Sequence, residues 1–247
     1  MDHPIRERLR QALGVYVITD SRLSLGRSNI EVVRQAIAGG ARLIQLREKE
    51  ASTREVVAMG QAILEITREA GALLLVNDRV DVAQAIGADG VHLGQDDLPA
   101  RLARRILGPA AIIGVTAETE AEARAAEATG ADYLGVGPIF PTSTKADAGA
   151  PYGTALIGRI KAVSALPVVA IGGIKTENAA EVAQAGRLPG HLEKLLGLKV
   201  RRTRRWTGHG GFHSRIYPSQ GSGTIRIPPR LNCAVAADGT RPDSSCG

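Results

Sequence analysis

Short apolar runs alternate with longer segments of helical period from residue 15 to residue 186. Each run is four or five residues long and nearly all aliphatic, which is typical of strands buried on both faces of a parallel sheet. The runs are Val15–Thr19, Leu43–Leu46, Leu73–Val76, Gly90–Leu93, Ile112–Val115, Tyr133–Val136 and Val168–Ile171. We therefore predict seven strands, each followed by a helix.

The segments between these runs are rich in alanine and carry apolar residues at helical spacing. We expect helices over Ile30–Ala38, Ser52–Ala70, Val82–Ile86, Leu98–Leu107, Ala121–Ala128, Ala155–Val163 and Glu177–Ala185. Ser52 and Glu55 have the spacing of a capping box. Glycine follows many of the segments, as it often does where a helix ends.

Seven strand–helix units in order indicate an α/β protein. It is either a (β/α)8 TIM barrel whose eighth unit is missing or replaced, or a doubly wound open sheet. Polar and charged residues directly follow most of the strands. In a barrel these positions share one rim, where active sites lie, so the barrel is the favoured interpretation.

Past Gly186 the pattern stops, so we divide the chain into a barrel domain, residues 1–186, and a tail, residues 187–247. The tail holds 11 Lys and Arg but 3 Asp and Glu, a formal charge of +8, whereas the barrel domain has −2. Low aliphatic content with high charge is typical of disorder. The net charge of +6 therefore reflects the tail and says nothing about partners of the barrel.

Composition sets two further limits. A hydrophobic content of 44% is enough for a sizeable core, which must be aliphatic because aromatic residues make up 3%. No apolar run approaches the ~18 residues that span a bilayer, and residues 1–14 lack the apolar stretch of a secretory signal. We expect a cytoplasmic protein without a membrane partner. Cys233 and Cys246 both lie in the tail and indicate neither a disulfide framework nor a zinc site.

Gln45, Arg47 and Lys49 occupy alternate positions at the end of the second predicted strand. Alternate side chains share one face of a strand, so all three should point into the mouth of the barrel. Two cations and an amide suit a diphosphate, because arginine offers a planar fork of donors and lysine a point charge. By spacing alone, a solvated strand end is an equally good interpretation.

Asp78 and Asp97 follow the third and fourth predicted strands. Mg²⁺ prefers one or two carboxylates together with water and phosphate oxygens. Each aspartate also precedes a predicted helix, where aspartate is favoured as a cap. Singly, each fits a cap better. As a pair beside a cationic strand end, they indicate an Mg²⁺ site.

Two further segments offer donors to an anion. Thr142, Ser143, Thr144 and Lys145 end a loop framed by glycine and proline after the sixth strand, although hydroxyl residues are also common in ordinary surface loops. Gly173 belongs to a Gly-Gly turn ahead of a helix, where backbone N–H groups can approach a phosphate. Such a turn can also serve only to reverse the chain tightly.

Six segments in this order resemble the thiamine-phosphate synthase family. They are Tyr16–Asp20, Gln45–Lys49, Val76–Asp78, Gly90–Asp97, Gly137–Lys145 and Val168–Ile174, and the resemblance spans residues 14–186. It implies a transferase that joins 4-amino-2-methyl-5-hydroxymethylpyrimidine diphosphate to a thiazole phosphate. The products would be thiamine phosphate and diphosphate.

The resemblance also implies a role for each matching residue. The pyrimidine diphosphate would be held by Gln45, Arg47, Lys49, Asn77 and Lys145, and the thiazole phosphate by Thr142, Ser143, Thr144 and Gly173. Asp78 and Asp97 would hold Mg²⁺. Thr116 would bind substrate, and catalysis would involve Lys145, Arg47 and Thr116. The reaction needs no general base, so we expect His92 to pack or to orient the rim.

The chain departs from the family pattern at two places. Thr116 and Glu118 stand where many relatives have Ser and His, although Thr116 keeps the hydroxyl. After Gly186 the family continues into an apolar eighth strand, whereas this chain reads Arg187-Leu188-Pro189-Gly190. The tail has the composition of an out-of-frame translation of a GC-rich gene. We therefore expect an unclosed barrel with exposed strand edges and reduced or absent activity.

Three alternatives stay open. The thiazole tautomerase shares this barrel, but it generally lacks the Gly137–Lys145 loop and relies on a His near position 118. A catalytically dead barrel would bind diphosphates without turnover. The Arg201–Arg205 run with Trp206 could bind nucleic acid, although a basic extension without function is the favoured interpretation. The expected partners are small-molecule substrates, and oligomeric state has no signature in the sequence.

Overall fold

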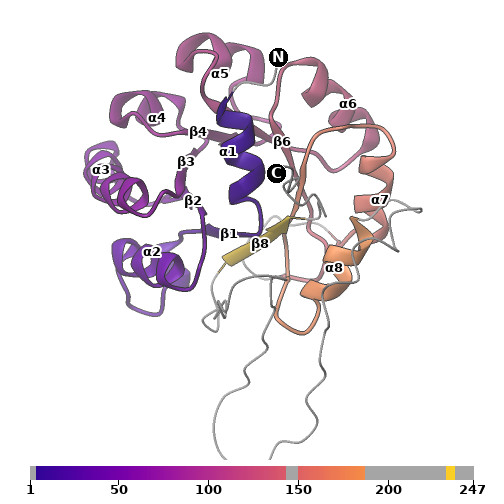
Figure 1. The fold of residues 1–247 in the computed structure, drawn as a ribbon, viewed down its shortest axis with the longest axis horizontal. Helices are drawn as coiled ribbons and strands as arrows, with labels where there is room; N and C mark the ends of the chain where they lie inside the picture. Colours follow the sequence, from indigo (N-terminus) through magenta and orange to yellow (C-terminus); the bar gives the residue numbers. More distant parts are fainter. Residues whose placement is uncertain (1–3, 143–149, 187–231, 237–247) are drawn as a thin grey trace, which may run out of the picture.

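A computed structural model shows the chain as a ring of strands surrounded by helices (Figure 1). The structure describes residues 4–142, 150–186 and 232–236. Seven parallel strands alternate with helices, and an eighth strand completes a closed barrel in which neighbours along the chain are also neighbours in space. The predicted TIM-barrel class is confirmed.

The seven parallel strands begin where the apolar runs predict and end within one residue of the predicted positions. They are β1 (Val15–Ile18), β2 (Leu43–Leu46), β3 (Leu73–Asn77), β4 (Gly90–Leu93), β5 (Ile112–Thr116), β6 (Tyr133–Val136) and β7 (Val168–Ala170). Their agreement with the pattern has a simple reason. Strands buried on both faces leave few positions for polar residues, so each run ends where the barrel wall ends.

All seven predicted helices are present. They are α2 (Asn29–Ala38), α3 (Thr53–Glu69), α4 (Val80–Ile86), α5 (Ala100–Leu107), α6 (Glu120–Ala128), α7 (Ala155–Lys161) and α8 (Ala179–Ala185). The capping box of α3 is confirmed. The Ser52 hydroxyl accepts from the Glu55 N–H at 3.4 Å, and the Glu55 carboxylate accepts from the Ser52 N–H at 2.8 Å.

A helix that the sequence pattern did not predict covers the amino-terminal end of the barrel. It is α1 (Pro4–Ala12), and Figure 1 shows it lying across the ring. Leu9, which is 1% exposed, packs with the residues inside the barrel. Arg6 pairs with Asp132 at 2.8 Å, just before β6 begins. The carboxyl ends of the strands therefore form the end of the barrel that α1 leaves uncovered.

The core has two parts. The larger part lies between the strands and the surrounding helices. The smaller part fills the inside of the barrel beneath α1 and includes Tyr16, Leu43, Leu75, Ile112 and Tyr133. Because successive side chains of a strand point to opposite faces, the same strands supply both parts.

The eighth strand, β8 (Asn232–Ala236), comes from the tail and runs antiparallel to both of its neighbours. Ile18 of β1 faces Asn232, and Ala170 of β7 faces Val235. The expectation of an unclosed barrel is therefore wrong. Backbone donors and acceptors can pair with a neighbouring strand in either direction. A short segment that is not part of a strand–helix unit can therefore pair with the open edges of both β1 and β7. Residues 187–231 and 237–247 of the tail lie outside the described residues.

Within the residues that the structure describes, no helix combines the length and apolar character needed to cross a membrane.

Candidate active site

Most of the predicted site residues lie where the parallel strands end, on the rim opposite α1. Asn77 and Thr116 are the last residues of β3 and β5, and Arg47 directly follows β2. Ser143, Thr144 and Lys145 lie outside the described residues. The site is therefore described below from the strand ends β1 to β5, together with the beginning of the loop after β6 and the turn after β7.

A hydrogen-bonded group inside the barrel leads from β2 to β5. The Gln45 amide donates to the Tyr16 hydroxyl at 2.7 Å, and the hydroxyls of Tyr16 and Tyr133 are 3.1 Å apart. The Tyr133 hydroxyl lies 2.8 Å from Nδ1 of His92, whose Nε2 lies 3.1 Å from the Thr116 hydroxyl. Gln45 is 2% exposed. The group therefore links two predicted substrate-binding residues through the barrel interior.

Two glycines make room for this group. A side chain at Gly114 would overlap the ring of Tyr133, and a Cβ at Gly135 would lie 2.7 Å from Cε1 of His92. The His92 and Tyr133 rings stack with centroids 5.5 Å apart. Burial lowers the pKa of His92 to about 4, although the charge of Asp97 acts the other way. His92 is therefore a neutral hydrogen-bonding residue at neutral pH, in line with the orienting role expected from the sequence.

Asp78, directly after β3, and Asp97, in the segment after β4, interact as a carboxylate pair. Burial, together with the hydrogen bond and the charge of Asp97, raises the pKa of Asp78 to about 6 against the opposing effects of Lys49 and Asn77. Asp78 also has a φ of 61°, a left-handed conformation that is uncommon outside glycine. The structure thus brings four predicted site residues together around an excess of negative charge.

Neither carboxylate caps a helix. The residue before α4 is Arg79 and the residue before α5 is Pro99, and neither helix start has a side-chain cap. Asp97 instead accepts from the backbone N–H of Gly94 at 2.6 Å. The helix-cap interpretation of the two aspartates is therefore not supported. Among the described residues no group of three or more His, Cys, Asp and Glu side chains gathers in a way that could hold a metal ion.

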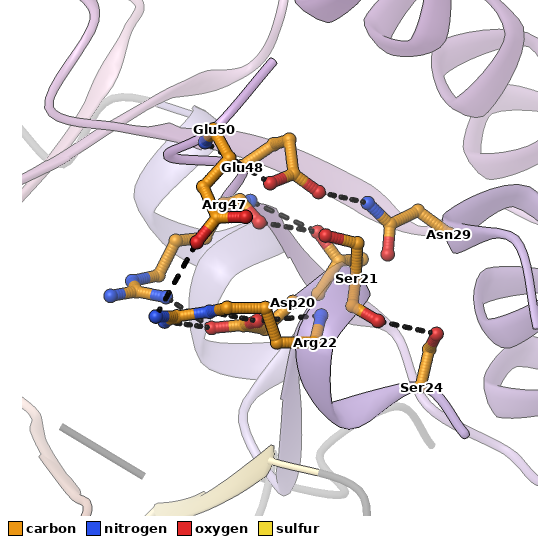
Figure 2. A network of polar contacts seen from close by, with 9 residues as sticks. Asp20, Ser21, Arg22, Ser24, Asn29, Arg47, Glu48 and Glu50 are labelled. Carbon is orange, nitrogen blue, oxygen red and sulfur yellow. Dashed lines mark hydrogen bonds and ion pairs between the residues drawn. The ribbon is translucent and has the colours of Figure 1, made fainter. Parts of the chain in front are cut away.

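Arg47 is held from the end of β1 rather than from β2 itself. Its Nη1 lies 2.5 Å from Oδ2 of Asp20, and its side chain is 15% exposed. Arg22 of the 3-10 helix η1 (Ser21–Leu23) reaches the same Asp20 oxygen at 3.1 Å. Figure 2 shows both arginine side chains converging on the Asp20 carboxylate, while Glu48 turns away to Asn29.

The loop after β6 and the turn after β7 lie against each other. The N–H of Phe140 donates to the carbonyl of Gly172 at 3.0 Å. A Cβ at Gly173 would lie 2.5 Å from the carbonyl oxygen of Pro141 and so could not fit. The absence of a side chain at Gly173 therefore allows the turn to approach the loop at Pro141, directly before Thr142. Thr142 itself is partly buried.

Tyr16, Asp20, Arg22 and Tyr133 lie in these groups but had no predicted role. The chain has four tyrosines, and aromatic residues make up 3% of it, so a tyrosine inside a predicted aliphatic strand was a usable signal. Asp20 follows the first strand directly, as Asp78 follows the third. Arg22 had no such signal, because its place in the site depends on the turn that η1 makes.

Comparisons with known proteins show which family the chain resembles. A family model described as thiamine monophosphate synthase matches residues 15–187. The thiamine-phosphate synthase of Moorella thermoacetica is 55% identical over 172 residues, which are 70% of this chain and 82% of that protein. The protein of the same name from Chloroflexus aurantiacus is 53% identical over 70% of this chain and 79% of its own length.

A solved structure, thiamine phosphate pyrophosphorylase from Pyrococcus furiosus, is 47% identical to this chain. It covers 72% of this chain, the match spans 84% of its own length, and the TM-score is 0.66. The family model covers more than half of the residues, and both synthases are more than half identical to it, so the chain belongs to the thiamine monophosphate synthase family.

Proposed function

We propose that this chain is a thiamine-phosphate synthase, a transferase that joins a pyrimidine diphosphate to a thiazole phosphate. The observation that carries the proposal is the interacting carboxylate pair of Asp78 and Asp97 beside Lys49 and Asn77, on the same rim as Arg47. Carboxylates and cations at one strand-end rim suit a metal-bound diphosphate. The family relatives bear the same name.

We assign the diphosphate to Arg47, Lys49, Asn77 and Lys145, with Gln45 holding the pyrimidine part of the same substrate from inside the barrel. Arginine and lysine provide charge-assisted donors to the phosphate oxygens. Gln45 already donates to the Tyr16 hydroxyl, which fixes the direction of its amide before substrate binds.

The second substrate, the thiazole phosphate, is assigned to Thr142, Ser143, Thr144 and Gly173. The contact between the Gly172-Gly173 turn and the loop after β6 supports this assignment, since it brings the backbone of the turn beside the part of the loop that leads to Thr142. Thr116 lies between the two groups of residues along the rim. Its hydroxyl is oriented by His92.

The chemistry follows from where charge develops. The bond between the pyrimidine methylene carbon and the diphosphate oxygen breaks, and the thiazole nitrogen forms a new bond to that carbon. Negative charge therefore grows on the leaving diphosphate. Fixed cations stabilise this charge more in the transition state than in the substrate. We propose that Arg47 and Lys145 act in this way, and that Thr116 orients the pyrimidine for attack.

The residues present fit Mg²⁺. The hydrogen bond and charge of Asp97 raise the pKa of Asp78, so a bound cation would relieve the repulsion between the two carboxylates, and oxygen ligands are those that Mg²⁺ prefers. We propose that Asp78 and Asp97 hold it. When bound, Mg²⁺ would neutralise charge on the diphosphate.

We also infer that residues 1–186 carry the active site, while the described residues 232–236 of the tail add β8 to the barrel. The tautomerase alternative gains no support, because the Glu118 carboxylate accepts a hydrogen bond from the Tyr152 hydroxyl at 2.9 Å and no His stands at that position.

The test is formation of thiamine phosphate by the full chain with both substrates and Mg²⁺, compared with Asp78→Asn. Turnover that drops at least a hundredfold in the variant, with an unchanged unfolding midpoint, supports the proposal. A folded wild-type chain that binds both substrates without turnover would contradict it and would identify a binding barrel.

A further inference from the structure

We propose that Asp20 is a positioning residue that holds Arg47 and Arg22 together as one two-arginine group for the diphosphate oxygens. This inference rests on the proposed function, since it concerns the same diphosphate. It adds a residue that positions Arg47 and a second arginine, neither of which has a role in the assignments above.

The Asp20 carboxylate is built into the rim. Its side chain is 4% exposed, and the residue lies between the end of β1 and η1. Burial raises the pKa of Asp20, but hydrogen bonds from the Arg22 side chain and backbone and the charges of Arg22 and Arg47 outweigh it, so that the pKa lies below its usual range. Asp20 is therefore ionised wherever the enzyme would operate.

Both arginines approach the same carboxylate. Arg47 Nη1 lies 2.5 Å from Oδ2, while Arg22 contacts Oδ2 through Nη2 at 3.1 Å and Oδ1 through Nε at 3.2 Å (Figure 2). The Arg22 backbone N–H also donates to Oδ1 at 3.1 Å. Asp20 thus accepts from three groups of Arg22 and one of Arg47, so its own position is strongly determined.

The charges of this group do not cancel. One buried carboxylate meets two guanidinium groups, which leaves an excess positive charge at the rim. Two further carboxylates act on Arg22. Glu50 lies at 3.8 Å with its side chain 66% exposed, and such solvent-exposed pairs contribute little, while Glu48 accepts a hydrogen bond from Asn29. Each guanidinium has five N–H donors, so both arginines retain donors for a diphosphate.

This arrangement explains why Arg47 points along the rim. A long arginine side chain has considerable rotamer freedom, and the contact with Asp20 restricts that freedom before substrate binds. Preorganisation of this kind gives affinity and rate without further contacts.

Two physical effects predict opposite results for Asp20→Asn. Removing a negative charge beside an anion site should strengthen anion binding if charge alone matters. If Asp20 positions the arginines, binding should instead weaken, by about tenfold or more. Asparagine is nearly isosteric and retains an acceptor for the Arg22 backbone N–H.

Asp132→Asn is a matched control at the other end of the barrel. Asp132 is also buried and also holds two arginines, Arg104 at 2.6 Å and Arg6 at 2.8 Å. Because it precedes β6, it lies at the end of the barrel that α1 covers, away from the rim. A general loss of stability should therefore appear in both variants, whereas a loss of diphosphate binding should appear in Asp20→Asn alone.

The experiment is calorimetric titration of the full chain with Mg²⁺-pyrophosphate, for wild type, Asp20→Asn, Asp132→Asn and Arg22→Ala. We expect binding to weaken at least tenfold in Asp20→Asn and several-fold in Arg22→Ala, with Asp132→Asn equal to wild type. Arg22 is half exposed, so its variant should fold even if Asp20→Asn does not. In steady-state assays of Asp20→Asn and Arg22→Ala, the KM for the pyrimidine diphosphate should rise as the binding of pyrophosphate weakens.

Equal or tighter binding by Asp20→Asn, or unchanged binding by Arg22→Ala, overturns the inference. An equal loss in the Asp132 variant overturns it too, because the effect would then be one of stability. Wild-type chain that binds pyrophosphate but forms no thiamine phosphate would contradict the proposed function, while the variants would still decide the role of Asp20.

Discussion

Replacing Tyr133 with phenylalanine tests the hydrogen-bonded group inside the barrel. Tyr133 is fully buried, and its hydroxyl lies 3.1 Å from that of Tyr16 and 2.8 Å from Nδ1 of His92. Phenylalanine keeps the ring and removes both contacts. Tyr16 retains Gln45 as a partner, whereas Nδ1 of His92 loses the contact with Tyr133.

The expected loss of stability follows from these contacts. A buried polar group left without its partner costs about 1–3 kcal/mol, and a lost neutral hydrogen bond about 1 kcal/mol. We therefore expect the free energy of unfolding of Tyr133→Phe to fall by about 2–4 kcal/mol. For a chain of this size each kcal/mol corresponds to roughly 2–4 °C in Tm.

Urea unfolding of the full chain, followed by far-UV circular dichroism, measures this difference. Tyr152→Phe is the control, because the Tyr152 hydroxyl also donates one hydrogen bond, to Glu118 at 2.9 Å, but the residue is 41% exposed. Its loss should stay within about 0.5 kcal/mol. If Tyr133→Phe loses no more than Tyr152→Phe, the interior group does not stabilise the barrel and the reasoning fails.

Three further predictions concern pH, metal and the tail. The pKa of His92 is lowered from 6.5 to about 4, so the unfolded chain binds a proton that the folded chain does not. This difference contributes about 3 kcal/mol to the free energy of unfolding; the full contribution is present above pH 6.5 and is lost as the pH falls to 4. In His92→Gln this part of the pH dependence should vanish, and matching unfolding curves for both proteins from pH 7 to 4 would contradict the assignment. Mg²⁺ should raise the Tm of wild type but not of Asp78→Asn. The affinity of wild type for Mg²⁺ should fall about tenfold from pH 7 to 5, because protons compete with the metal for the Asp78 carboxyl, whose pKa is about 6. A calorimetric titration with Mg²⁺ that shows no effect of pH would argue against Asp78 as a ligand. A chain ending at residue 231 leaves β1 and β7 with open edges, so we expect it to unfold at lower urea and to aggregate, whereas a transition equal to that of the full chain would show that β8 contributes nothing to stability.

The strands and helices of the barrel domain could be read from local patterns. Runs such as Leu43–Leu46 admit no polar residue because both faces of the strand are covered, and Ser52 with Glu55 marks the start of α3 through contacts between residues three apart. Both signals are local, so a single sequence contains them. The helix α1 was missed because its apolar residues are few, and Leu9 becomes buried only when the barrel end is present to receive it.

The sequence predicted which residues belong to the candidate site better than it predicted what those residues contact. Alternation along β2 indicated Gln45, Arg47 and Lys49, yet the three differ in the structure. Gln45 points into the barrel, Arg47 is held by Asp20, and Lys49 is exposed. The contacts of Arg47 and Gln45 come from β1, which lies beside β2 only once the ring has formed.

Local patterns of residues were enough to predict the order of the strands and helices, to favour the barrel over an open sheet and to give the residue types at the rim, because these depend on short-range periodicity and on which strands are buried. The tertiary structure alone decided which polar groups meet. The pairing of Asp78 with Asp97, the path from Gln45 to Thr116 and the sharing of Asp20 by Arg47 and Arg22 all join different strand ends. It also decided that residues 232–236 close the barrel, since backbone pairing requires open edges on β1 and β7 and depends little on the side chains that fill them.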